Sequence, residues 1–156
     1  MKFWPTVREA EPKDLHHLLD IDIKCFDYCW SGDDWRTVAS AEKVKVLVAT
    51  WYGTTLGFAV TEPSESGLFM PKLAIKPNYQ NRGLGRILLG KVWERAYTLE
   101  LSKIETVVSE TMCDPSVDRN AATWLLKMHF KATGVKKQFV KLYGQYEDGY
   151  KFELEV

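Results

Sequence analysis

The chain has 156 residues, of which 46% are apolar and 27% are charged. This size and composition are typical of one globular domain with a hydrophobic core, and they exclude a disordered or fibrous chain. Its 21 basic and 21 acidic residues cancel, so the overall charge favours neither a nucleic acid nor an anionic membrane surface as partner. We therefore expect a single domain over residues 1–156.

No apolar run approaches the roughly 20 residues that a membrane helix needs, and the first residues, MKFWPTVREA, lack the apolar segment of a signal peptide. We expect a cytoplasmic protein. Cys25, Cys29 and Cys113 form an odd set without the pattern of a disulfide framework. His16 and His17 lie upstream of the first two cysteines, but the ligand spacing of a known zinc class does not occur, so we expect no metal.

In chain order, the first part of the sequence predicts a strand, two helices and a β-hairpin. The first strand contains Pro5, which is typical of a sheet edge because proline cannot donate to the ladder. An aromatic and acidic loop separates the two helices, and a turn at Gly53 joins the hairpin strands. The expected ranges are 3–8 for the strand, 12–26 and 35–41 for the helices, and 45–51 and 55–60 for the hairpin.

The second part begins with a strand over residues 68–75. Pro71 lies in its middle, where proline removes a ladder hydrogen bond, so we expect a bulge or local break there. A turn then leads into a helix from Leu84 to about Leu101. The remaining elements are a strand over 102–110, a helix over 118–129 with Asp118 or a neighbour as N-cap, and strands over 136–143 and 149–156. This order predicts an α+β domain with a mixed sheet and helices on both faces.

The stretch KLAIKPNYQNRGLGRILL, residues 72–89, carries the sharpest functional signal. A short apolar strand stops at Pro77, and a turn with Gly83 and Gly85 leads directly into the helix. These glycines allow the backbone to approach a ligand, and the first helical turn leaves N–H groups without partners. Together with the helix dipole, these groups form an anion site suited to a pyrophosphate. Turn formation alone could account for one of the glycines.

The spacing Gln-x-x-Gly-x-Gly, from Gln80 to Gly85, follows a strand that ends in Leu-Ala-Ile-Lys-Pro. This combination resembles the acetyl-coenzyme A signature of the GNAT superfamily of N-acetyltransferases. The order of the elements is similar to the GNAT fold over essentially the whole chain. The residues from Tyr143 to Leu154 look like the tail of the protein N-terminal subgroup, which includes the ribosomal-protein N-terminal alanine acetyltransferases. The resemblance implies a mixed sheet of about seven strands, with the fourth and fifth strands splayed apart.

The resemblance also implies that acetyl-CoA is the acetyl donor. Its pantetheine arm would pair with the backbone of the fourth strand, and a backbone N–H near Leu73 would polarise the thioester carbonyl. Asn120 looks like the family asparagine that bonds the pantetheine arm, although it could simply be an N-terminal helix residue. The implied donor-binding residues are Leu73, Ala74, Ile75, Gln80, Asn81, Arg82, Gly83, Leu84, Gly85, Arg86 and Asn120.

Acetyl transfer to an amine needs a base, because an ammonium group has no free lone pair. Glu110 closes the predicted fifth strand and matches, by position, the family glutamate, but it could also be a solvated strand-end carboxylate. The family often supplies a tyrosine from the next helix as acid, and here that position falls on Leu125 or Lys127. Tyr143 or Tyr146 in the last hairpin is then the candidate acid, unless the thiolate leaves unassisted.

The sequence therefore predicts an N-acetyltransferase that acts in a ternary complex on a primary amine, with a peptide α-amine as the first choice. A small polyamine or aminoglycoside is the alternative, because the acidic residues Asp27, Asp33 and Asp34 would suit a cationic acceptor. A CoA-binding domain that has lost catalysis is a further reading, and the missing tyrosine favours it. Either a monomer or a homodimer is compatible with the sequence.

Overall fold

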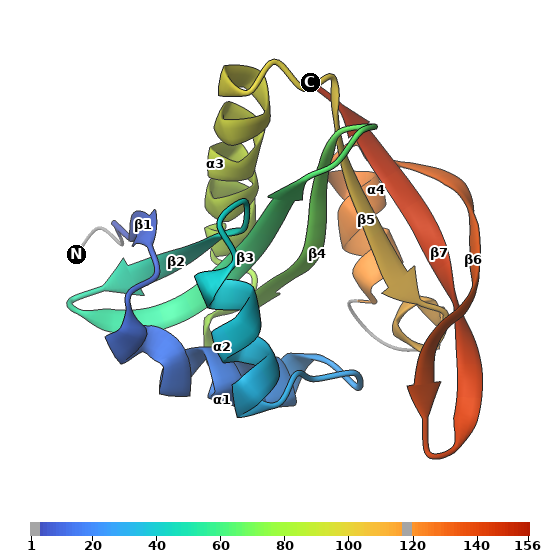
Figure 1. Ribbon diagram of the computed structural model, residues 1–156, viewed down its shortest axis with the longest axis horizontal. Coiled ribbons are helices and arrows are strands. Elements are labelled where there is room, and N and C mark those ends of the chain that lie inside the picture. Colours follow the sequence, from blue (N-terminus) through green and yellow to red (C-terminus); the bar gives the residue numbers. More distant parts are fainter. Residues whose placement is uncertain (1–3, 117–119) are drawn as a thin grey trace.

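In residues 4–116 and 120–156, which the computed structural model describes, seven strands form one sheet in the order β1-β2-β3-β4-β5-β7-β6 (Figure 1). Neighbouring strands are antiparallel except β4 and β5, which are parallel. The strands are β1 (Thr6–Glu9), β2 (Lys45–Trp51), β3 (Thr54–Pro63), β4 (Leu68–Ile75), β5 (Lys103–Ser109), β6 (Lys131–Leu142) and β7 (Gln145–Glu155). The predicted α+β fold with a mixed sheet is confirmed.

Helices cover both faces of this sheet. One face carries α1 (Leu15–Cys25) and α2 (Gly32–Ser40), and the other carries α3 (Leu84–Thr98) and α4 (Ala121–Lys127). Short 3-10 turns, η1 (Pro12–Asp14), η2 (Pro77–Tyr79) and η3 (Thr111–Cys113), precede α1, α3 and α4. Within the described ranges, no helix is long and apolar enough to cross a membrane.

Each face buries its own apolar cluster, so β3 and β4 are covered on both sides. On the α1 and α2 side, Leu18, Ile21 and Trp35 pack against Phe58 and Ala74. On the other side, the stripe along α3 packs with the same sheet and with α4. That second cluster includes Leu84, Leu88, Val92, Leu125, Leu56, Ala59, Leu68, Met70 and Ile104. These two cores hold the centre of the sheet in place around the site described below.

The predicted order of elements is confirmed, while local hydrogen bonds move several boundaries. Helix α2 begins at Gly32 rather than residue 35 because the Ser31 hydroxyl accepts from the Asp34 amide at 3.0 Å in a capping box. Helix α3 ends at Thr98, where the amide of Leu101 turns back to the Ala96 carbonyl at 2.9 Å.

The later and outermost elements differ in length from the sequence prediction. Asn120 is the N-cap of α4, and Asp118 lies outside the described residues. The last two strands are longer than expected because they pair along most of their length around a tight turn at Tyr143 and Gly144. Strand β3 extends to Pro63, and β1 begins at Thr6, while residues 1–3 lie outside the described part.

Candidate active site

The parallel strands β4 and β5 form a fork. They pair only at Leu68 with Ile104 and at Phe69 with Glu105. A last connection follows, in which the Thr106 hydroxyl donates to the Met70 carbonyl at 2.7 Å. Beyond it the two strands separate toward their carboxyl ends (Figure 1). The gap exposes backbone polar groups that a continuous sheet would have paired.

A β-bulge lies where β4 leaves β5. Val60 of β3 lies opposite Lys72, and Glu62 lies opposite Phe69. Two residues of β4, Met70 and Pro71, therefore share the single residue between Val60 and Glu62 on the neighbouring strand. A bulge bends its strand and disturbs the ladder, and proline supplies no N–H at this point. The distortion predicted at Pro71 is confirmed.

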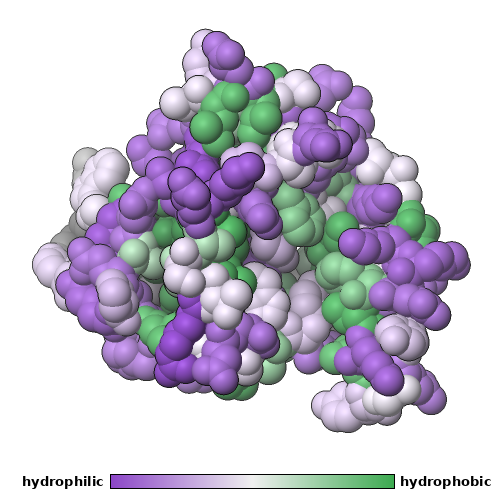
Figure 2. Space-filling view, in the orientation of Figure 1, coloured by the Kyte–Doolittle hydropathy of each residue, from purple (hydrophilic) through white to green (hydrophobic). Residues whose placement is uncertain are grey.

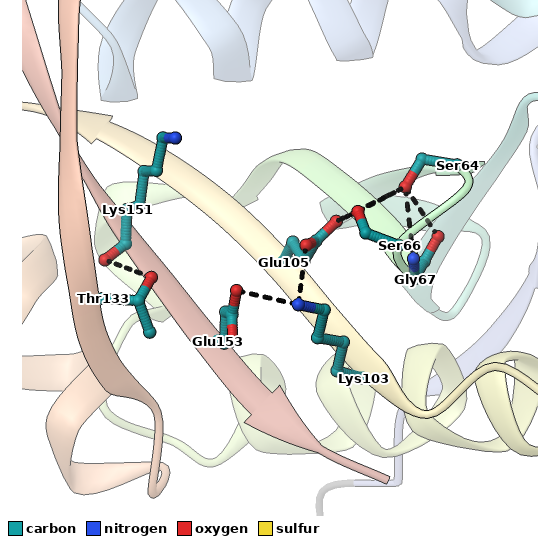
Figure 3. A network of polar contacts seen from close by, with 8 residues as sticks. All are labelled: Ser64, Ser66, Gly67, Lys103, Glu105, Thr133, Lys151 and Glu153. Atoms are coloured by element: carbon teal, nitrogen blue, oxygen red, sulfur yellow. Dashed lines mark hydrogen bonds and ion pairs between the residues drawn. The ribbon is translucent and has the colours of Figure 1, made fainter.

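A polar network clamps the closed end of the fork (Figure 3). The Glu105 carboxylate accepts from the Ser66 hydroxyl at 2.8 Å and from the Ser64 hydroxyl at 3.3 Å. Lys103 Nζ lies 3.3 Å from Glu105 and 3.0 Å from Glu153. The network joins the turn between β3 and β4 to β5 and β7. The separation of β4 and β5 is thus confined to their other end.

A cavity of about 660 Å³ occupies the fork. Its walls come from β4, β5, the turn before α3, helix α4 and the loop after α1, so residues from both faces of the sheet line it. In the space-filling view, a hollow lies near the middle of the molecule, and hydrophobic residues come to the surface there (Figure 2). This cavity is large enough for an extended organic group.

The open edge of β4 faces this cavity. The Lys76 amide donates to the Leu56 carbonyl of β3 at 2.7 Å. Because backbone groups alternate in direction along a strand, those of Leu73 and Ile75 point away from β3. The Ile75 carbonyl accepts from the side-chain amide of Gln80 at 3.0 Å and from the Cys25 thiol at 3.3 Å. The backbone N–H and carbonyl of Leu73 are directed into the gap.

The beginning of α3 lies at one end of the cavity. Gly83 is its N-cap, with a φ of 86°, and among the described residues no side chain caps the helix. The first amides of this helix therefore form a local positive end. Gly85 serves a different purpose, because a Cβ there would lie 3.0 Å from Cζ2 of Trp124 in α4. One glycine allows the turn, and the other allows two helices to meet at the cavity.

Most of the predicted donor-binding residues line the cavity: Leu73, Ala74, Ile75, Gln80, Asn81, Gly83, Gly85 and Arg86. Leu84 is buried in the core with 1% exposure, and the Arg82 guanidinium lies over the Tyr79 ring at 5.2 Å. The Asn120 side chain accepts from the amide of Thr123 at 2.8 Å. Its function as a helix cap is therefore confirmed, and its bond to a pantetheine arm stays a prediction.

The structure does not bring the two predicted catalytic residues together. Glu110 follows β5 directly with an exposed side chain, and its amide donates to the Asp148 carbonyl at 3.0 Å. Tyr143 is fully exposed at the tip of the β6–β7 hairpin. Neither residue lines the cavity. The catalytic roles of both stay predictions, and the location of Tyr143 does not favour its role as acid.

The loop after α1 supplies residues that the sequence analysis did not single out as part of a site. Phe26 and Tyr28 both line the cavity. The Tyr28 ring meets Phe139 edge-on at 5.4 Å between centroids. Its hydroxyl is buried and has no hydrogen-bond partner among the described residues. Burial raises the pKa of Tyr28, and the nearby backbone of Ser109 opposes this shift. The alternation of Phe26, Tyr28 and Trp30 was the signal that could have identified this wall.

Of the two half-buried cysteines, Cys25 lines the cavity and Cys113 follows Met112, which also lines it. Burial raises the pKa of Cys25 to about 11, with the negative charge of Asp22 adding to the effect. Burial also raises the pKa of Cys113. Because the thiolate is the nucleophilic form, neither side chain is activated at physiological pH. This arrangement does not favour a covalent acyl-cysteine intermediate.

The forked mixed sheet, with a helix N-terminus at one end of the gap, agrees with the architecture that the sequence resemblance implies for an acetyltransferase. Residues 15–118 match the model described as the Acetyltransferase (GNAT) family, and the chain belongs to this family. The comparison with curated proteins gave no match. The family resemblance noted in the sequence is thereby confirmed.

Solved structures share the fold over nearly the whole chain. The ribosomal-protein-S18-alanine N-acetyltransferase from Escherichia coli has a TM-score of 0.80 at 19% identity, covering 98% of this chain and 94% of that one. NAA60 of Arabidopsis thaliana, in complex with a bisubstrate analogue, has a TM-score of 0.82 at 17% identity, covering 98% of both chains. The same protein in complex with acetyl-CoA has a TM-score of 0.80 at 18% identity, covering 98% of this chain and 99% of that one.

Proposed function

We propose that the protein transfers the acetyl group of acetyl-CoA to a primary amine, and that this amine is the N-terminus of a peptide. The observation that carries the proposal is the direction of the Leu73 backbone, which points away from β3 into a cavity that ends at the N-terminus of α3. A pantetheine arm can pair with a strand edge, and a pyrophosphate is stabilised at the positive end of a helix. NAA60, which shares the fold, was solved with acetyl-CoA.

In the proposed reaction, the acceptor nitrogen attacks the carbonyl carbon of the thioester while both substrates are bound. The C–N bond forms, the C–S bond breaks, and the proton lost by nitrogen is balanced by protonation of the CoA sulfur. The Leu73 N–H donates to the carbonyl oxygen as negative charge develops on it. Glu110, directly or through water, removes the proton of the acceptor.

A peptide is the better supported acceptor. The fold is shared with an S18-alanine N-acetyltransferase and with NAA60 bound to a bisubstrate analogue. Two of the three acidic residues that could have held a polyamine have partners in α2 or at its N-cap. Asp33 pairs with Arg36 at 2.9 Å, and the Asp34 carboxylate accepts from the Ser31 amide at 3.0 Å. Two of the three acidic groups are thus occupied by their own helix.

Acetyl-CoA binding is tested by its effect on stability. At about a hundred times its dissociation constant, acetyl-CoA should stabilise the native state by roughly 2.7 kcal/mol. The measurement is urea unfolding at fixed protein concentration, with ATP at the same concentration as the control ligand. An unfolding curve that acetyl-CoA leaves unchanged would remove the donor assignment.

Catalysis is tested with a panel of peptides that differ in the first residue, together with spermidine, by following acetyl transfer by mass spectrometry. Glu110→Gln should slow turnover mainly below the pKa of a peptide α-amine, about 7.7–8.0, where most of the acceptor is protonated. The exposed Glu42→Gln is the matched control. Wild-type rates for Glu110→Gln at low pH would contradict its role as base. Tight acetyl-CoA binding without any transfer would favour a CoA-binding module that has lost catalysis.

A further inference from the structure

A buried ion pair outside the donor cavity joins β4 to α1. Lys72 Nζ lies 2.6 Å from Oδ1 of Asp22, and the two side chains are 1% and 0% exposed. The other oxygen of Asp22 accepts from the amide of Trp30 at 2.9 Å and from Nε1 of Trp35 at 3.0 Å. Lys72 also donates to the carbonyl of Tyr28 at 2.9 Å. Three further polar groups, two from the loop after α1 and one from α2, thus bond to this pair of charges.

The pair holds the loop after α1 by both its backbone and its rings. Phe26, Tyr28 and Trp30 alternate with exposed residues, so their rings lie on one side of the loop. The ammonium group of Lys72 lies 4.4 Å from the ring centroid of Trp30, 4.8 Å from that of Phe26 and 5.3 Å from that of Tyr28. An aromatic face attracts a cation more strongly when the cation is shielded from water. Residues 26–30 are therefore fastened around Lys72.

The β-bulge determines that Lys72 points toward this loop. Before the bulge, Leu68 and Met70 pack in the cluster under α3. After it, Ala74 packs in the cluster under α1 and α2, and Lys72 bonds to Asp22 on that same side. Successive side chains of a strand alternate between faces, and one extra residue reverses the phase. The feature that opens the fork also turns Lys72 toward the loop.

We propose that Lys72 is a positioning residue, which fixes residues 26–30 through Asp22 and the Tyr28 carbonyl so that Phe26 and Tyr28 form a wall for the acceptor. The inference rests on the proposed function, because it takes the amine acceptor to enter beside Leu73, the neighbour of Lys72 in β4. Adjacent residues of one strand then serve the two substrates. Leu73 contacts the donor through its backbone, and Lys72 arranges the acceptor wall through its side chain.

An ion pair that served only core stability would not need hydrogen bonds to the Trp30 amide and the Tyr28 carbonyl. An apolar pair of similar volume is often as stabilising as a buried ion pair, because charges lose hydration on burial. Apolar side chains would leave the Trp30 amide and the Tyr28 carbonyl without these partners. The specific consequence of the pair is the conformation of the loop, and this gives it a measurable signature.

The test compares Lys72→Met, the double variant Asp22→Asn/Lys72→Met, and Lys45→Met as control. Lys45 is a lysine of β2 with a carboxylate partner, Glu9, at 2.7 Å. The single Lys72 variant leaves the Asp22 carboxylate buried without its cation, so folding is checked by circular dichroism. The double variant carries no isolated charge, and its asparagine oxygen can still accept from a tryptophan N–H. It keeps the test valid if the single variant does not fold.

Two readouts separate positioning from stability. Hydrogen exchange of residues 26–31, measured by mass spectrometry, should be faster by at least about tenfold in the Lys72 variants, with exchange in α3 unchanged. The KM for the best peptide of the panel should rise about tenfold, while the dissociation constant for acetyl-CoA stays within about twofold of that of the wild type. Lys45→Met should change none of these quantities.

Unchanged exchange and an unchanged peptide KM in the double variant would overturn the proposal. An equal loss of affinity for acetyl-CoA and peptide would also overturn it, because that result indicates a general structural role. If the wild type binds acetyl-CoA but acetylates no member of the panel, the proposed function fails, and the acceptor role of Lys72 fails with it. The exchange data would then still show whether Lys72 fixes the loop.

Discussion

Replacing Gly85 with alanine should destabilise the protein, although alanine is the better helix former. The new Cβ would lie 3.0 Å from Cζ2 and 3.4 Å from Cε2 of Trp124, closer than carbon atoms normally approach. The helix preference contributes about 0.5–1 kcal/mol in favour of alanine, whereas overpacking costs typically about 1–3 kcal/mol. The overpacking term is larger, so we expect a net loss of about 1 kcal/mol.

Gly90→Ala is the matched control for Gly85→Ala, because it lies on the same helix with nothing within 4 Å of the new methyl group. It should stabilise the protein by about 0.5–1 kcal/mol. The assay is urea unfolding of both variants, with the midpoint and the slope fitted separately. If Gly85→Ala were as stable as Gly90→Ala, the contact between α3 and Trp124 would not be what requires glycine at this position.

Two further predictions concern the ion pair between Arg8 and Asp14 and the hydrogen bond of Thr106. Hydrogen bonds from Arg8 lower the pKa of Asp14 from 3.8 to about 2. The Asp14 carboxylate should therefore contribute about 2 kcal/mol to the free energy of unfolding above pH ~4, and this contribution should be lost as the pH falls toward 2. Urea unfolding between pH 2 and 5 should show a flatter dependence for Arg8→Met, and an unchanged slope would contradict this. Thr106→Val should cost about 1 kcal/mol by removing the bond to the Met70 carbonyl, while Thr133→Val, on the exposed β6, should cost almost nothing. Equal stabilities of these two variants would show that the connection does not hold the fork.

The distorted strand β4 and the turn into α3, which we propose bind the donor, could be predicted from sequence because their signals are local. Pro71 indicated a distorted strand, and the spacing of Gly83 and Gly85 indicated a turn into a helix. Gly83 acts through its own φ of 86°, a property that local sequence can carry. The need for glycine at position 85 arises from Trp124, a residue of another helix. Local pattern therefore identified this glycine but not the physical reason for it.

The loop that we propose as a wall for the acceptor could not be predicted in the same way. Asp22 and Lys72 are separated by 50 positions in the chain. From its own sequence context, each residue would be expected to be a solvated charge. Their pairing depends on the bulge in β4, which changes the face that Lys72 occupies. Tyr143 was predicted from its residue type and its place in the last hairpin, and the structure shows it fully exposed at the tip of that hairpin. Residue type alone did not show which tyrosine lies at the cavity.

The bulge also has a consequence for how β4 can vary between related proteins. Substitution in residues 68–75 changes one side chain and leaves the others on their faces. Insertion or deletion of a single residue would shift the phase of every side chain on one side of the change. Lys72 would then point toward α3, and Leu73 would lie under α1. The length of β4 should therefore be under stricter selection than its composition.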